Sequence, residues 1–90
     1  MSQFGKQARQ TAILEVVENQ IRENNPPETR QTLERLIASD IPKEEAMRLI
    51  GCVVASEIFE VLNQGKPFDL KRYITALNAL PTLPWDSEKA

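Results

Sequence analysis

The chain has 90 residues, a formal net charge of −2, one Cys and no His. This length fits one small domain, which we expect to span residues 1–90 with residues 1–5 and 86–90 frayed. A His-based catalytic triad is excluded, and zinc, haem and iron–sulfur centres lack the His and Cys ligands that they need. The composition therefore indicates no metal, no cofactor and, on balance, no enzyme.

The charge and the single Cys also bear on location and partners. A pI of about 5.1 gives no electrostatic footprint for DNA or RNA. The longest apolar run, residues 49–55, is too short to span a bilayer, and we expect no secretory signal at the N-terminus. Because one Cys cannot form an internal disulfide, we expect a reducing, cytoplasmic location.

Chain breakers divide the sequence into four segments with helical periodicity. The expected helices cover residues 3–24, 26–39, 42–64 and 70–80, with an extended C-terminal tail. Short connections between them favour antiparallel neighbours. The predicted fold class is all-α, a compact array of about four helices with the third at its centre.

The first two expected helices each have one apolar face. In the first helix it consists of Ile13, Val16, Val17 and Ile21. In the second it is shorter and consists of Leu33, Leu36 and Ile37. Asn25 is the expected N-cap of the second helix, with Pro26 at its first position.

The third expected helix is apolar on most sides, and Gly65 follows it as a stop signal. Such a helix lies at the centre of a bundle or is shared with a second subunit, so we expect a homodimer. Gly51 and Ala55, one turn apart, allow another helix to approach closely. Cys52 is expected to be a packed core thiol, because nothing nearby gives it an electropositive setting.

The fourth expected helix has Asp69 as its N-cap and ends before Pro81. Its apolar stripe consists of Leu70, Tyr73, Ile74 and Leu77. In the tail, Trp85 has two open interpretations. It forms an exposed anchor for a partner together with Leu83 and Phe68, or the tail covers the end of the bundle.

Glu57 is the residue whose position most needs an explanation, because it falls within an apolar stripe of the third helix. A buried carboxylate is unfavourable unless it is paired or neutralised. One interpretation is a general base or a ligand contact. The other is internal pairing with Arg35, Arg48 or Tyr73. The candidate residues of interest are therefore Glu57, Tyr73 and Trp85.

Charged residues offer two further hypotheses, neither of which we favour. The first is a carboxylate metal site made of Glu44, Glu45, Glu57 and Glu60. It lacks the His that di-iron helical bundles use. The second is a basic patch for nucleic acid made of Arg30, Arg35, Lys71 and Arg72. A solvated, salt-bridged helix face is the simpler interpretation.

Short motifs between Asn25 and Pro84 resemble a family of short uncharacterised bacterial helical proteins, a domain of unknown function. The motifs are Asn25-Pro26-Pro27-Glu28, Glu45-Ala46, Pro67-Phe68-Asp69, Tyr73 and Leu80-Pro81. The resemblance implies a helical fold and no activity. This chain has Glu44 where relatives often have His beside the Glu-Ala motif, which weakens a metal site carried over from them.

Three classes of function follow from these patterns. The first is a small interaction or regulatory module that acts through helix faces and the Trp85 tail. The alternative is a small ligand-binding protein or enzyme built around Glu57. The third is weak nucleic-acid binding.

Overall fold

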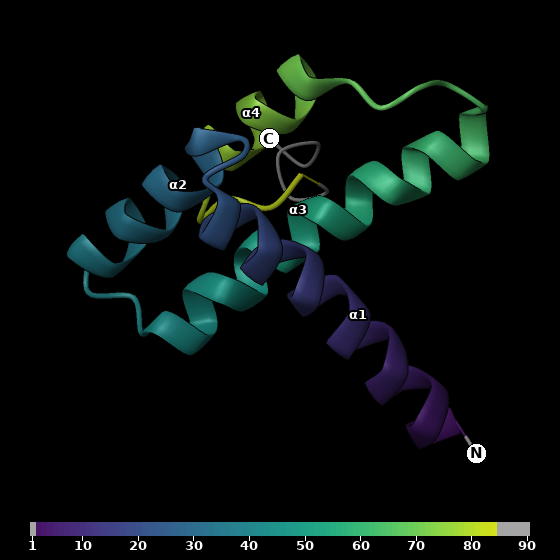
Figure 1. The fold of residues 1–90 in the computed structure, drawn as a ribbon, viewed down its shortest axis with the longest axis horizontal. Helices are drawn as coiled ribbons and strands as arrows, with labels where there is room; N and C mark the ends of the chain where they lie inside the picture. Colours follow the sequence, from purple (N-terminus) through teal and green to yellow (C-terminus); the bar gives the residue numbers. More distant parts are fainter. Residues whose placement is uncertain (1, 85–90) are drawn as a thin grey trace.

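The computed structural model describes residues 2–84, with side chains from residue 12 onward. These residues form four helices and no strand, as Figure 1 shows. The helices are α1 (Ser2–Glu23), α2 (Pro27–Ala38), α3 (Lys43–Gln64) and α4 (Leu70–Ala79). The all-α prediction is confirmed, and each predicted helix limit lies within one residue of the observed one.

Left-handed residues end the first three helices where the chain breakers predicted. Asn24 has φ 52° after α1, Asp40 has φ 68° after α2, and Gly65 has φ 66° after α3. After α1 and α2, the next amide bonds back to the carbonyl five residues earlier, at 3.0 and 3.1 Å. This Schellman arrangement satisfies carbonyls that the helix leaves free.

One predicted N-cap is confirmed and the other is wrong by one residue. The Asp69 carboxylate accepts a hydrogen bond of 3.2 Å from the Arg72 amide at the start of α4. The N-cap of α2 is Pro26, with Pro27 at the first helical position. Asn25 lies one residue before that N-cap, and its amide closes the C-terminal turn of α1.

The core lies where all four helices meet. Its buried apolar side chains are Val17, Leu33, Leu36, Ala46, Leu49, Ile50, Val53, Val54, Tyr73, Leu77 and Leu80. Helix α3 contacts each of the other three helices, as its composition predicted. Helix α2 does the same, so the two helices share the central position.

Three residues that were predicted to lie on the buried apolar faces of their helices are exposed. Val16 is 39% exposed, Ile37 43% and Leu70 46%. Helix α2 completes its buried face with Thr29 and Thr32 instead. The reason is helical spacing, since these two threonines share a face with Leu33 and Leu36, whereas Ile37 lies beside it.

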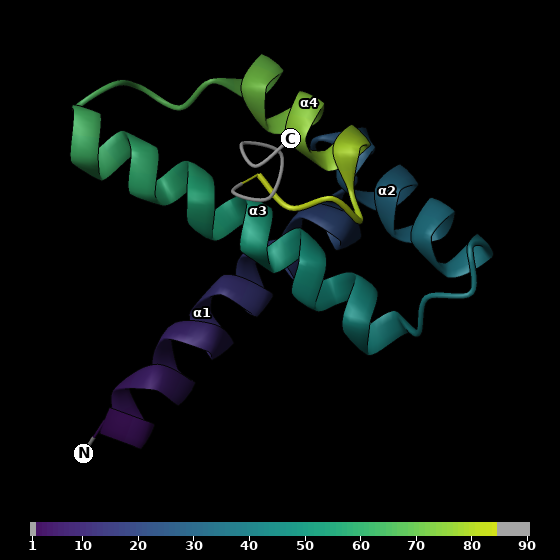
Figure 2. The same ribbon diagram turned by 180° about the vertical axis from the view of Figure 1, so that it is seen from behind.

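Helix α1 crosses α3 at Gly51, so the helix that passes this small residue is α1 of the same chain. A Cβ atom at Gly51 would lie 3.4 Å from Cγ2 of Ile13, which is an ordinary van der Waals distance, so the crossing leaves room for a small side chain. Beyond the crossing, the N-terminal half of α1 and the C-terminal half of α3 diverge, as Figures 1 and 2 show.

The C-terminal tail is described as far as Pro84. Leu83 is half-buried and packs against the core. Trp85 lies outside the described residues, so both interpretations of it stay predictions.

Candidate functional site

An apolar groove of about 300 Å³ lies between α1 and the C-terminal half of α3. Its lining consists of Val16, Gln20, Val54, Glu57, Ile58, Val61, Leu62, Phe68 and Tyr73. This α1–α3 groove has the minimum size of ligand-binding pockets, and its polar atoms come from Gln20, Glu57 and Tyr73. Glu57 and Tyr73, two of the three candidate residues from the sequence, therefore both line this groove.

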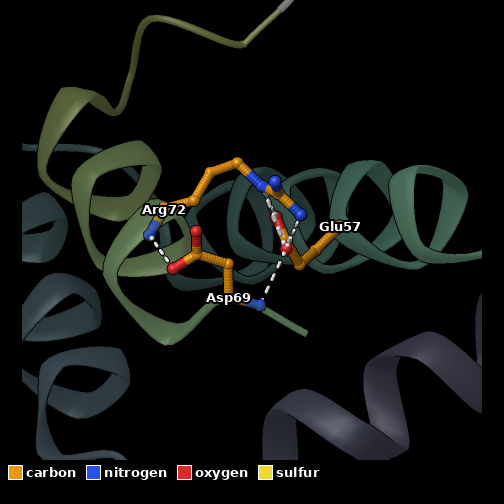
Figure 3. A network of polar contacts seen from close by, with 3 residues as sticks. All are labelled: Glu57, Asp69 and Arg72. Carbon is orange, nitrogen blue, oxygen red and sulfur yellow. Dashed lines mark hydrogen bonds and ion pairs between the residues drawn. The ribbon is translucent and has the colours of Figure 1, made fainter. Parts of the chain in front are cut away.

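Glu57 projects from α3 toward the first turn of α4, where Arg72 holds it (Figure 3). Arg72 donates Nε to Oε1 at 3.0 Å and Nη2 to Oε2 at 2.6 Å. The Asp69 amide approaches Oε2 at 3.5 Å. The hydrogen bond to Glu57 raises the pKa of the Arg72 guanidinium. Two parallel charge-assisted bonds fix the orientation of both side chains.

The pairing explains how a carboxylate is tolerated at a position that is only 7% exposed. Both oxygens of Glu57 are occupied by donors of the same chain, which favours the paired interpretation over a general base. The partners expected from the sequence, Arg35, Arg48 and Tyr73, are wrong. Asp69 caps α4, and its own amide lies next to Glu57. The first turn of α4, which carries Arg72, therefore lies against Glu57.

Tyr73 belongs to a buried polar network that joins three helices. Its hydroxyl donates to Oε1 of Gln20 on α1 at 2.8 Å, and the Thr29 hydroxyl of α2 donates to the same oxygen at 2.8 Å. The two hydroxyl oxygens lie 3.3 Å apart. Burial raises the pKa of Tyr73, and hydrogen bonding with Thr29 and Gln20 opposes part of that rise.

Sequence reasoning singled out Tyr73 and missed its two partners. Thr29 is fully buried, and its signal was helical spacing. It precedes Leu33 by four residues and therefore shares the face of that core residue. Gln20 precedes Ile21 and carries no comparable signal.

The arginines of the hypothetical basic patch are engaged within the chain. Arg30 pairs with Glu34 at 3.5 Å. Arg35 donates to the carbonyls of Leu77 at 3.0 Å and Leu80 at 2.9 Å, at the C-terminal end of α4. This contact satisfies carbonyls that the helix leaves free and places a positive charge near the negative end of the helix dipole. These contacts support the salt-bridged interpretation of this surface.

Cys52 lies in a second groove, of about 690 Å³, beside α1 and the N-terminal half of α3. The thiol is half-buried, so the prediction of a packed core position is wrong. Helix α1 covers α3 only at the crossing and leaves the face with Cys52 open. Arg48 approaches Sγ at 3.9 Å while it pairs with Glu45, and that pairing lowers the pKa of the Glu45 carboxyl.

Large apolar side chains surround the α1–α3 groove and remain accessible. Phe59 and Leu62, one turn apart on α3, are 62% and 79% exposed, and we call them the α3 ridge; Leu62 also lines the groove. We define the apolar patch as the ridge together with Val16, Ile58 and Phe68. The fractional exposures of these five residues correspond to roughly 500 Å² of exposed surface in total, within the range of the largest patch on a monomer.

Within residues 12–84, no group of three acidic or Cys side chains is placed to hold a metal ion. The four glutamates of the hypothetical carboxylate site do not gather. Every helix described is too short or too polar to span a bilayer.

Comparison with protein-family models, curated proteins and solved structures found no significant match to this chain. The resemblance to short bacterial helical proteins therefore stays a prediction.

Proposed function

We propose that this protein is a small protein–protein interaction module that binds its partner through the apolar patch. The observation that carries the proposal is a groove lined by the exposed side chains of Leu62 and Phe68, with the exposed Phe59 one turn from Leu62 on α3. Burial of roughly 500 Å² of apolar surface is worth on the order of 10 kcal/mol before the entropy of association is subtracted. A surface of this kind favours contact with another protein over contact with water.

The polar groups of the groove support this choice over a small enzyme or ligand-binding protein. Arg72 occupies both oxygens of Glu57, and the hydroxyl of Tyr73 is bonded to Gln20. These contacts support a structural role for both residues over a role as a base or ligand contact. The engaged arginines likewise weaken the case for nucleic-acid binding.

A cytoplasmic setting fits the same proposal. Cys52 is half-buried and open to the second groove, where a reducing compartment keeps the thiol free of intermolecular disulfides.

Site-specific photo-crosslinking in living cells tests the proposal. A photoreactive residue replaces Leu62 in one variant and Ile37 in the control, since both are exposed apolar residues on different helices. We expect a discrete protein adduct from position 62 and none from position 37. Equal labelling from both positions, or none from position 62, would contradict the proposed function.

A further inference from the structure

We infer that the partner is a second copy of this chain, docked about a two-fold axis so that the α3 ridge of each copy lies in the α1–α3 groove of the other. This inference rests on the proposed function and names the partner for the same patch. Three properties of the patch support it: its shape, its charge and its area.

The shape is self-complementary. The patch holds a concave part, the α1–α3 groove, and Leu62 in its lining is 79% exposed and lies one turn from the 62% exposed Phe59 on α3. In an isologous interface the same surface serves both subunits, so it must contain a protrusion and a matching recess. Figure 1 shows that the C-terminal half of α3 projects beyond its crossing with α1.

The charge of the patch also favours a second copy. Across a two-fold axis, an uncompensated charge lies near its own copy and repels it. Glu57, the carboxylate in the groove lining, is neutralised by Arg72, and the exposed members of the patch are apolar. A strongly acidic or basic partner would find no opposite charge within the patch, whereas a second copy meets no repulsion there.

The area agrees with what a stable dimer needs. A standard interface buries about 800 Å² on each partner, and homodimer interfaces are about 65% apolar. The apolar share of such an interface is therefore roughly 500 Å², which is the size of the patch.

Light scattering coupled to size-exclusion chromatography tests this inference on the full chain. At micromolar concentration we expect a mass twice the 10.2 kDa of the chain. Leu62→Glu places a charge in the partner's groove twice per dimer, so we expect the dissociation constant to rise by about 100-fold or more. Phe59→Glu, the second variant, should act in the same direction.

Ile37→Glu is the matched control, because Ile37 is an exposed apolar residue on α2, outside the patch. It should leave the dimer intact, and circular dichroism checks that every variant keeps its helices. A wild-type chain that stays monomeric would overturn the inference. A dimer that Ile37→Glu dissociates and Leu62→Glu does not would overturn it as well.

The crosslinking experiment separates the two proposals. An adduct from position 62 that contains a different protein, with a monomeric chain in solution, overturns the second copy and leaves the proposed function standing. An adduct of twice the chain mass supports both. No adduct from position 62 and a monomeric chain overturn both.

Discussion

Arg72 lays its guanidinium across both carboxylate oxygens of Glu57, which lies 15 residues earlier in the chain. The pair joins the first turn of α4 to the C-terminal half of α3. The carboxylate is almost fully buried, whereas the Arg72 side chain is 37% exposed. The buried partner therefore depends on the accessible one, and this asymmetry gives the first prediction.

Removal of either partner should destabilise the fold, but not equally. Glu57→Gln keeps an acceptor for Arg72 and should lower the free energy of unfolding by about 1 kcal/mol, because solvent screens part of the lost charge interaction. Arg72→Met leaves the carboxylate buried without its donor and should lower stability more than Glu57→Gln does. Urea denaturation followed by circular dichroism measures both changes.

Lys71→Met is the control, since Lys71 is exposed and adjacent to Arg72. Its stability should stay near that of the wild type. An Arg72→Met variant as stable as the wild type would show that the pair does not support the fold.

The cap that Arg35 places on α4 should depend on the guanidinium shape. Arg35→Lys keeps the charge but loses the planar fork that reaches two carbonyls, so stability should fall by about 1 kcal/mol. Arg30→Lys on the same helix should change stability by less than about 0.5 kcal/mol, because the Arg30–Glu34 pair is exposed. Thermal unfolding of the two variants measures the two changes in stability. An equal loss of stability in both variants would argue that Arg35 does not cap α4.

The ionisation of Tyr73 should couple stability to alkaline pH. Burial raises its pKa in the folded chain above the ordinary value, which the unfolded chain retains at about 10. Below pH 10 both states keep the proton, so the contribution is constant. Above that value the unfolded state loses the proton first, and stability falls until the folded pKa is passed.

Tyr73 is the only Tyr in the chain, so tyrosinate absorbance reports on this residue alone. We expect the folded chain to titrate at higher pH than the chain in concentrated urea. Tyr73→Phe should lose part of the alkaline drop in stability. Identical titration curves for the folded and unfolded chains would refute the coupling.

Substitution by Ala should change the stability of the chain in opposite directions at two glycines. At Gly51 a Cβ atom meets only the ends of the Ile13 and Leu14 side chains, at 3.4 and 3.8 Å. Gly51→Ala should therefore raise stability by about 0.5–1 kcal/mol through helix propensity. At Gly65, φ is 66° and space is open, so Gly65→Ala should lower stability by about 1 kcal/mol through backbone strain. Denaturation midpoints test both, and a destabilised Gly51→Ala would mean that the helix crossing cannot yield.

Local chemistry explains why the helix limits could be predicted. Asp69 and Gly65 act on the backbone within a few residues of themselves, so their effect can be read without the fold. The wrong N-cap at Asn25 shows the limit of such reasoning. The same residue serves the end of α1, and only the structure shows which helix it belongs to.

The candidate site was less predictable because its contacts join distant parts of the chain. Glu57 could be recognised as a residue that needs a partner from its place among apolar neighbours. The choice of Arg72 depends on how α4 lies against α3, which no local pattern encodes. Thr29 was missed because hydropathy alone treats a Thr as a surface residue, although its spacing from Leu33 placed it on the buried face.

One oxygen atom, Oε1 of Gln20, accepts both the Thr29 and the Tyr73 hydroxyls. Detachment of α1 from the body therefore leaves two donors, on two other helices, without their acceptor at the same moment. Local opening of α1 and loosening of the α2–α4 contact are thus coupled events, and amide hydrogens on all three helices should exchange together.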